Sequence, residues 1–135
     1  MYKRQPAVVS RFLDALAAGD AQAAANAFTQ TGYFRESLPM LDAHHGTAEL
    51  RSFFAQQFSL GGGIGLRPCS VTDDGVRCAV EFNCSRWGTH ELPPQAGIGV
   101  YERDAGGLLA AARVYDDIES PVHLDRQGAR VPSPQ

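Results

Sequence analysis

The stretch that most constrains the fold is residues 95–121, which predicts two adjacent β-strands joined by a tight turn. The first arm ends near Tyr101, and residues 104–107 read DAGG, a composition that tolerates the left-handed backbone angles of hairpin turns. The second arm covers about residues 108–118 and ends before Pro121, which cannot donate into a strand ladder. A lone hairpin is marginally stable in water, so the rest of the chain must cover one of its faces.

The periodicity of the preceding sequence predicts that cover. Apolar residues such as Val8, Phe12 and Leu16 recur at helical spacing, whereas apolar and polar residues alternate from Ile64 onward. The elements expected before the hairpin are, in order, a helix ending at Gly19, a helix over 21–28 anchored by Phe28, a strand over 33–37, a loop over 38–46, a helix over 47–58 capped by Thr47, strands over 64–72 and 76–87, and a turn over 88–94. Three helices covering one face of a strongly curved antiparallel sheet form an α+β fold, and the open end of this cone is the expected ligand pocket.

Length and composition limit the classes of partner. The chain has 135 residues, enough for one domain, which we expect over 1–121, with a loosely ordered C-terminal tail over 122–135. A net charge of −3 with scattered arginines argues against nucleic-acid binding, and no stretch is apolar for long enough to span a membrane. Three cysteines without CxxC spacing favour reduced thiols in the cytoplasm over a metal site. The triple glycine at 61–63 lacks the context of a phosphate loop, so we expect no cofactor.

Three segments carry a family resemblance. The opening VVSRFLDALAAGDAQAAANAF, the helix start HHGTAELRSFF and the final AARVYDDIESP resemble the NTF2-like superfamily, in its SnoaL-like or ketosteroid isomerase-like branch, over about residues 6–121. The resemblance implies a cone-shaped pocket and a homodimer. It also implies activities such as steroid isomerisation, polyketide cyclisation, epoxide hydrolysis or dehydration, although one fold serves many functions.

Most of the catalytic residues of these relatives have no counterpart in this sequence. Matching the segments to ketosteroid isomerases puts Phe12 at the tyrosine position, Ser37 at the aspartate position with Glu36 beside it, and Gly99 at the second acid. The standard ketosteroid isomerase mechanism is therefore not expected. The last-strand aspartate of the limonene-epoxide-hydrolase pattern falls on Arg113 here, which weakens that alternative as well.

Strand alternation predicts which side chains point into the cone. The expected inward set is Cys78, Val80, Phe82 and Cys84 on one strand, Gly97, Gly99 and Tyr101 on the next, and Ala111, Arg113 and Tyr115 on the last. Its small residues either leave room for a ligand or allow close packing of the first helix. The predicted ligand-binding residues are Phe12, Tyr33, Ser37, Phe82, Tyr101, Arg113 and Tyr115.

Three residues are candidates for catalysis. A buried Arg113 needs a partner such as Glu36 or Asp117 and would stabilise an oxyanion on the ligand; a structural ion pair or a solvent-facing side chain are the alternatives. Glu36 or His44 would then shuttle a proton. The sequence thus predicts a protein that binds a small apolar or aromatic molecule, with a cyclase-, isomerase- or hydrolase-type activity. The rival is a non-catalytic ligand-binding or protein-interaction module that acts as a homodimeric scaffold.

Overall fold

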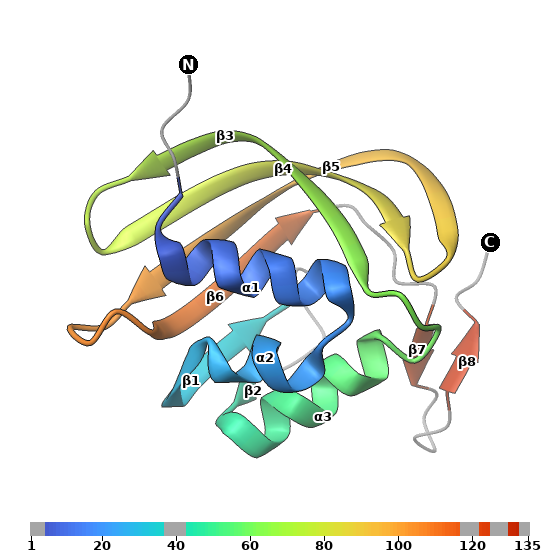
Figure 1. Cartoon of the computed structure of the whole chain (residues 1–135), viewed down its shortest axis with the longest axis horizontal. Helices are drawn as coiled ribbons and strands as arrows, with labels where there is room; N and C mark the ends of the chain where they lie inside the picture. Colours follow the sequence, from blue (N-terminus) through green and yellow to red (C-terminus); the bar gives the residue numbers. More distant parts are fainter. Residues whose placement is uncertain (1–4, 37–42, 117–121, 125–129, 133–135) are drawn as a thin grey trace.

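A curved sheet wraps around the N-terminal helices, as the computed structural model shows (Figure 1). The structure describes residues 5–36, 43–116, 122–124 and 130–132. The elements are α1 (Ala7–Ala18), α2 (Ala21–Asn26), β1 (Phe28–Arg35), β2 (His44–His45), α3 (Thr47–Gln57), β3 (Ile64–Asp73), β4 (Arg77–Trp87), β5 (His90–Arg103), β6 (Leu109–Asp116), β7 (Val122–Leu124) and β8 (Arg130–Pro132).

The first two helices follow local rules of the sequence. The apolar stripe of α1 is buried, and Gly19 ends the helix in the left-handed region at φ 70°. The Asp20 side chain accepts a hydrogen bond of 3.0 Å from the backbone N–H of Ala23 and so caps α2. The boundary expected between these helices is confirmed.

The segment after α2 differs from the expectation in two places. Phe28 begins the strand β1 and does not anchor the second helix, which ends at Asn26. His44 and His45 form the short strand β2, paired with Phe34 and Tyr33 of β1, within the stretch expected to be a loop. Two residues are too few to show an alternating pattern, so only the pairing partner reveals this strand.

Helix α3 is capped differently from the expectation. Gly46, with φ 84°, occupies the cap position in place of Thr47. The carboxylate of Glu49 reaches back and accepts a hydrogen bond of 3.0 Å from the backbone N–H of His45. An acidic side chain in the first turn therefore satisfies a donor just before the helix and complements its dipole.

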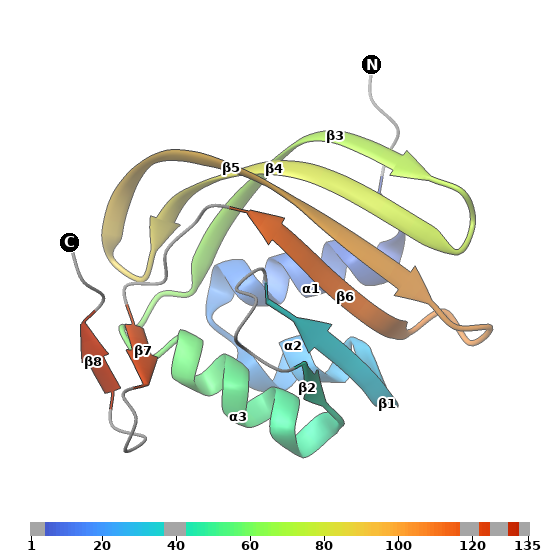
Figure 2. The ribbon, with the colours of Figure 1, turned by 180° about the vertical axis from the view of Figure 1, so that it is seen from behind.

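The main sheet has the strand order β2-β1-β6-β5-β4-β3. All neighbours are antiparallel except β1 and β6, which run parallel with Phe34 opposite Ala112. The expected antiparallel sheet thus contains one parallel pair. From behind, β1 and β6 are seen pointing in the same direction, while β3, β4 and β5 arch over α1 (Figure 2).

The strand β5 extends through a region expected to be a turn. The turn was expected to cover residues 88–94, but β5 begins at His90, so Pro93 already lies within the strand. The β4–β5 pairing is interrupted between Cys84, which faces Gln95, and Arg86, which faces Glu91. Proline is tolerated there because the irregular register demands no N–H from it.

The triple glycine packs against the end of α1. All three glycines of the stretch have positive φ, and the backbone of Gly63 lies against the last turn of α1. Arg86 fixes the same region, because its guanidinium donates to the carbonyl of Ala17 at 3.1 Å and to that of Gly88 at 2.9 Å. The glycine-rich connection between α3 and β3 is therefore packed closely against both α1 and the end of β4.

Phe12 lies at the centre of the core and is fully buried. Its ring contacts those of Phe28, Phe34, Phe54 and Tyr101, with centroid separations of 5.4 to 6.3 Å. Aromatic contacts in this range favour edge-to-face and tilted arrangements. The aromatic residues of α1, β1, α3 and β5 thus form one cluster.

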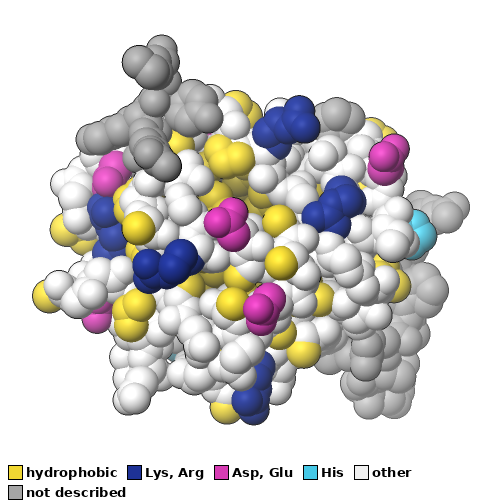
Figure 3. All heavy atoms as spheres, in the orientation of Figure 1, with side chains coloured by type: hydrophobic (Ala, Val, Ile, Leu, Met, Phe, Trp, Pro, Cys, Tyr) yellow, Lys and Arg dark blue, Asp and Glu magenta, His cyan; other side chains and the backbone are white. Residues whose placement is uncertain are grey.

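The C-terminal segment contains two short strands, β7 and β8, which pair antiparallel with each other. The division into a domain and a loose tail stays a prediction. No helix in the described part of the chain is long and apolar enough to cross a membrane. On the face that carries the helices, Lys and Arg side chains lie apart from one another, with acidic side chains between them (Figure 3).

Candidate functional site

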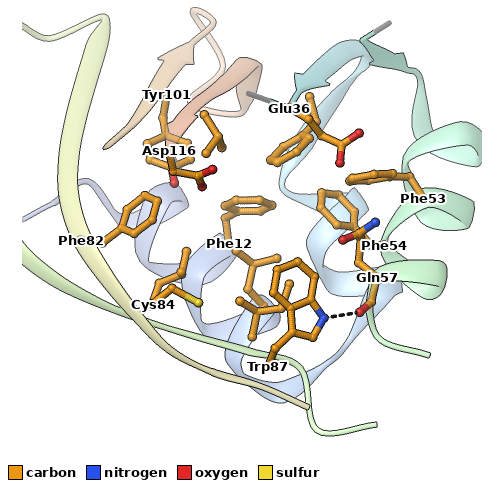
Figure 4. Close-up of a pocket in the computed structure, with 15 residues that line it drawn as sticks. Phe12, Glu36, Phe53, Phe54, Gln57, Phe82, Cys84, Trp87, Tyr101 and Asp116 are labelled. Atoms are coloured by element: carbon orange, nitrogen blue, oxygen red, sulfur yellow. Dashed lines mark hydrogen bonds between the residues drawn. The ribbon is translucent and has the colours of Figure 1, made fainter. Parts of the chain in front are cut away.

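A largely apolar pocket lies between the helices and the inner face of the sheet. Its volume is about 110 Å³. Aromatic and aliphatic side chains dominate the walls, and Glu36, Gln57, Tyr101 and Asp116 supply the polar groups (Figure 4). The apolar lining comprises Phe12, Leu16, Phe34, Phe53, Phe54, Ile64, Leu66, Phe82, Cys84, Trp87 and Val114. An apolar cavity of about 150 Å³ is large enough for benzene, so this space suits a compact molecule.

Two carboxylates reach the pocket from neighbouring parallel strands. Glu36 directly follows β1, and Asp116 is the last residue of β6. Because β1 and β6 are parallel and nearly in register, the carboxyl ends of both strands lie at the same end of the sheet. Alternation places both side chains on the face of Phe34 and Ala112, so the acids share one pocket.

Glu36 is held by His44. The His44 Nε2 and Glu36 Oε2 atoms are 3.2 Å apart, and the two side chains are 23% and 19% exposed. The imidazole stacks on Phe53 with a centroid distance of 3.9 Å and an interplanar angle of 20°. A carboxylate with a fixed imidazole partner beside an apolar pocket is a suitable proton acceptor.

The Tyr101 hydroxyl occupies the space of the side chain that Gly99 lacks. A Cβ at Gly99 would lie 2.6 Å from Tyr101 Cζ and closer still to the hydroxyl. Tyr101 is only 1% exposed, and its hydroxyl lies beside Gly99 on the side of the pocket. Burial, together with the nearby Cys78 and Asp116, raises the pKa of Tyr101 well above its usual value. The phenol therefore stays protonated and can donate a hydrogen bond.

The small residues of β5 make room for neighbouring side chains. A Cβ at Gly97 would lie 2.8 Å from the Phe82 ring and 2.6 Å from the Cβ of Asp116. The predicted alternatives were space for a ligand or close packing of the first helix, but aromatic rings of the sheet itself occupy the space next to both Gly97 and Gly99. Burial raises the pKa of the neighbouring Cys84 thiol, which stays neutral.

The predicted inward orientation of Arg113 and Tyr115 is wrong. Tyr101 faces Ala112 and Val100 faces Arg113 across the β5–β6 ladder, so Arg113 lies on the outer face. Its guanidinium donates to Tyr33 Oη at 3.0 Å and to Glu102 Oε1 at 2.6 Å. The Arg113 hydrogen bond lowers the pKa of Glu102. Burial alone would lower the pKa of Arg113, but the bonds to Glu102 and Tyr33 raise it overall.

The outer face also accounts for the other predicted tyrosines. Tyr115 is 45% exposed and accepts a hydrogen bond of 2.6 Å from Arg35, whose guanidinium also lies over its ring. Tyr33 faces the same way through its bond to Arg113. Neither Tyr33 nor Tyr115 lines the pocket. Arg113 therefore takes part in a structural ion pair with Glu102, not with Glu36.

The sequence-predicted set is thus divided between two faces. Phe12, Phe82, Tyr101 and Glu36 line the pocket, and His44 supports it through Glu36. Ala111, predicted to point inward, belongs to the opposite face from Val114 and Asp116, and Ser37 lies outside the described residues. The sequence missed Asp116, Gln57 and most of the phenylalanines. Alternation alone could not have found Asp116, because the inward face of β6 is decided by the pairing of Tyr101 with Ala112 in the structure.

Comparisons with known proteins agree with this architecture. A family model for the SnoaL-like domain matches residues 9–112. A Catenulispora acidiphila protein with a ketosteroid isomerase-like fold, solved in complex with trimethylamine, has a TM-score of 0.71 at 12% identity, over 87% of this chain and 90% of that one. The epoxide hydrolase/cyclase-like enzyme SalBIII, described in pyran ring formation in the polyether salinomycin, has a TM-score of 0.67 at 18% identity, over 84% and 90%.

A third similar structure is an NTF2-like protein from Cytophaga hutchinsonii, with a TM-score of 0.64 at 18% identity, over 85% of this chain and 94% of that one. No curated protein sequence matches the chain significantly. At these identities the structural likeness establishes the fold alone.

Proposed function

Because the chain belongs to the SnoaL-like domain family, we propose that it is an enzyme that transfers a proton on a small, mostly apolar substrate bearing a carbonyl-type oxygen. Isomerase- and cyclase-type reactions both require such a step. The observation that carries the proposal is the convergence of the Glu36 carboxylate and the Tyr101 hydroxyl on one apolar pocket.

Each polar group has a distinct role in this reaction. Glu36, paired with His44, removes a proton from the carbon next to the carbonyl. Tyr101 donates a hydrogen bond to the oxygen on which negative charge develops, and its raised pKa keeps that hydrogen in place. The protonated Glu36 then returns this proton to another atom of the substrate, and Asp116 is a second carboxylate at the same end of the pocket. The apolar walls exclude water and strengthen these interactions.

The absence of an acid at Gly99 is compatible with this proposal. A ketosteroid isomerase-like site needs a hydrogen-bond donor aimed at the developing oxyanion, and a tyrosine hydroxyl meets that need as a carboxylic acid does. Tyr101 brings its hydroxyl into the space beside Gly99 from two residues further along β5. Likewise, Glu36 takes the place of the acid expected at the neighbouring Ser37.

The test is proton exchange into small cyclic ketones dissolved in heavy water, followed by NMR. We expect the protein to accelerate deuterium incorporation next to the carbonyl. Glu36→Gln should reduce this rate by about 10²–10⁴-fold, and Tyr101→Phe by about 10²–10³-fold. Glu81→Gln, on the exposed outer side of β4, is the matched control and should exchange like the wild type. Equal rates for the wild type and Glu36→Gln would contradict the proposal.

A second candidate function, non-catalytic binding of a small alkylammonium ion, is favoured by the charge and composition of the pocket. Glu36 and Asp116 are its charged lining residues, and among the described residues that line it none is Lys or Arg. Aromatic rings such as Trp87 and Phe82 are the groups that cage alkylated ammonium ions by cation–π attraction. The trimethylamine complex of the Catenulispora protein adds support for this ligand class.

Calorimetric titration separates the two candidates. Trimethylammonium should bind much more tightly than neutral tert-butanol, and Asp116→Asn should remove most of the difference. Comparable affinity for the cation and the neutral alcohol would exclude this candidate. The homodimer and the cytoplasmic location remain predictions from the sequence.

A further inference from the structure

The side-chain amide of Gln57 lies on the wall of the pocket. Gln57 is the last residue of α3 and is only 8% exposed, in a core that is otherwise apolar among the described residues. Its amide points into the pocket beside Phe54 (Figure 4). Within the described part of the chain the amide makes no side-chain hydrogen bond, and its polar atoms are not among the fully buried ones that lack a partner, so the amide is open to the pocket.

The backbone of Gln57 is fixed independently of this amide. The indole Nε1 of Trp87 donates a hydrogen bond of 3.0 Å to the Gln57 carbonyl oxygen, and this contact is buried. Helix α3 and the end of β4 therefore hold the residue in place while its side chain remains available to an occupant of the pocket. A polar side chain that opens onto an otherwise largely apolar pocket can orient an occupant by hydrogen bonding to it.

The chemistry of the amide defines its partner. A glutamine side chain offers a carbonyl acceptor and N–H donors together, so its best complement is a neutral group that both donates and accepts, such as a hydroxyl or a carboxamide. A carboxylate on the ligand is disfavoured, because Glu36 and Asp116 already place negative charge in this low-dielectric space.

We propose that Gln57 is a specificity-determining residue that selects ligands carrying a neutral hydroxyl or carboxamide group in addition to the oxygen bound by Tyr101. The inference rests on the proposed function for the site of that first oxygen. It adds the substrate class: a compact apolar skeleton with two separated polar groups. A site that hydrogen-bonds one group of its ligand discriminates strongly against analogues that lack it, because its own buried polar group is then left unpaired.

The experiment is a binding comparison of two cyclohexanones, one with a hydroxyl opposite the carbonyl and the other with a methyl group there. Dissociation constants are measured by NMR titration for the wild type, for Gln57→Met and for Gln56→Met. Methionine keeps the length of glutamine but lacks its amide. Gln56 is the matched control, because it precedes Gln57 on α3 and does not line the pocket. Melting curves establish that each variant is folded.

We expect the wild type and Gln56→Met to prefer the hydroxyl compound by about tenfold, the value of one well-placed hydrogen bond. Gln57→Met should bind both compounds with nearly equal affinity. The two ligands and the two proteins, wild type and Gln57→Met, form a double-mutant-type cycle. This cycle isolates the contact between Gln57 and the ligand hydroxyl from the effects of Glu36 and Tyr101. Equal affinities in the wild type, an undiminished preference in Gln57→Met, or no binding of either compound would overturn the proposal.

This result is independent of the exchange rates. A preference that depends on Gln57 in a protein that does not accelerate proton exchange would refute the proposed catalysis and leave the specificity intact. Proton exchange without a preference that depends on Gln57 would refute the specificity and leave the proposed catalysis intact.

Discussion

Replacing Gly63 with alanine should destabilise the protein much more than the same change at Gly61. Both glycines have positive φ, 71° and 78°, so either alanine incurs the left-handed penalty of about 1–2 kcal/mol. At Gly61 nothing lies within 4 Å of the added Cβ. At Gly63 the Cβ would lie 2.5 Å from the backbone nitrogen of Gly19, 2.7 Å from the carbonyl oxygen of Ala17, and nearer still to that of Leu16.

These neighbours are backbone atoms of a helix end, so they cannot move aside by rotating a side chain. Overpacking of this kind costs about 1–3 kcal/mol more. We therefore expect Gly61→Ala to lower the free energy of unfolding by about 1–2 kcal/mol, and Gly63→Ala by about 3–4 kcal/mol. The difference of about 2 kcal/mol reflects contact with α1 alone.

Urea unfolding followed by circular dichroism measures both variants. With a slope of about 2 kcal/mol per molar urea, the two midpoints should be separated by about 1 M. Equal midpoints would refute the reasoning, because they would mean that the α3–β3 link does not press against α1 and is merely a flexible connection.

Two further predictions concern titratable groups. The hydrogen bond from Arg113 lowers the pKa of Glu102 in the folded state, so this carboxylate stabilises the fold above its unfolded pKa of about 4.5, and the contribution is lost as the pH falls through the lower folded value. Glu102→Gln should thus lose less stability than the wild type between about pH 5 and about pH 3, as thermal melts would show, and parallel losses would contradict this. A thiol reagent should label Cys69 in the native protein, and Cys78 and Cys84 only after unfolding, because both are fully buried and burial raises the pKa of Cys84. Rapid native labelling of all three would show that the core opens.

Much of the fold was predictable because it is governed by local chemistry. The apolar stripe of α1, the Gly19 ending and the Asp20 cap each depend on residues close together in the chain. Alternation likewise predicted correctly that Phe82 on β4 and Tyr101 on β5 face the pocket.

The candidate site was less predictable, and β6 shows why. Alternation states that Arg113 and Val114 lie on opposite faces, but not which of them is inside. The predicted choice placed Arg113 inward, and the ladder with β5, which sets Ala112 opposite Tyr101, reverses it. The same reversal brings Asp116 into the pocket.

The sequence by itself therefore determined the type of each long element and the division of each strand into two faces, because these properties arise between neighbours in the chain. The tertiary structure alone decided that Glu36 and Asp116 share one end of the sheet, since this requires parallel pairing of strands about eighty residues apart. It alone decided that the Gln57 side chain lines the pocket, because this depends on how α3 packs against the sheet. The polar groups of the pocket are therefore brought together by contacts between residues that are far apart in the sequence.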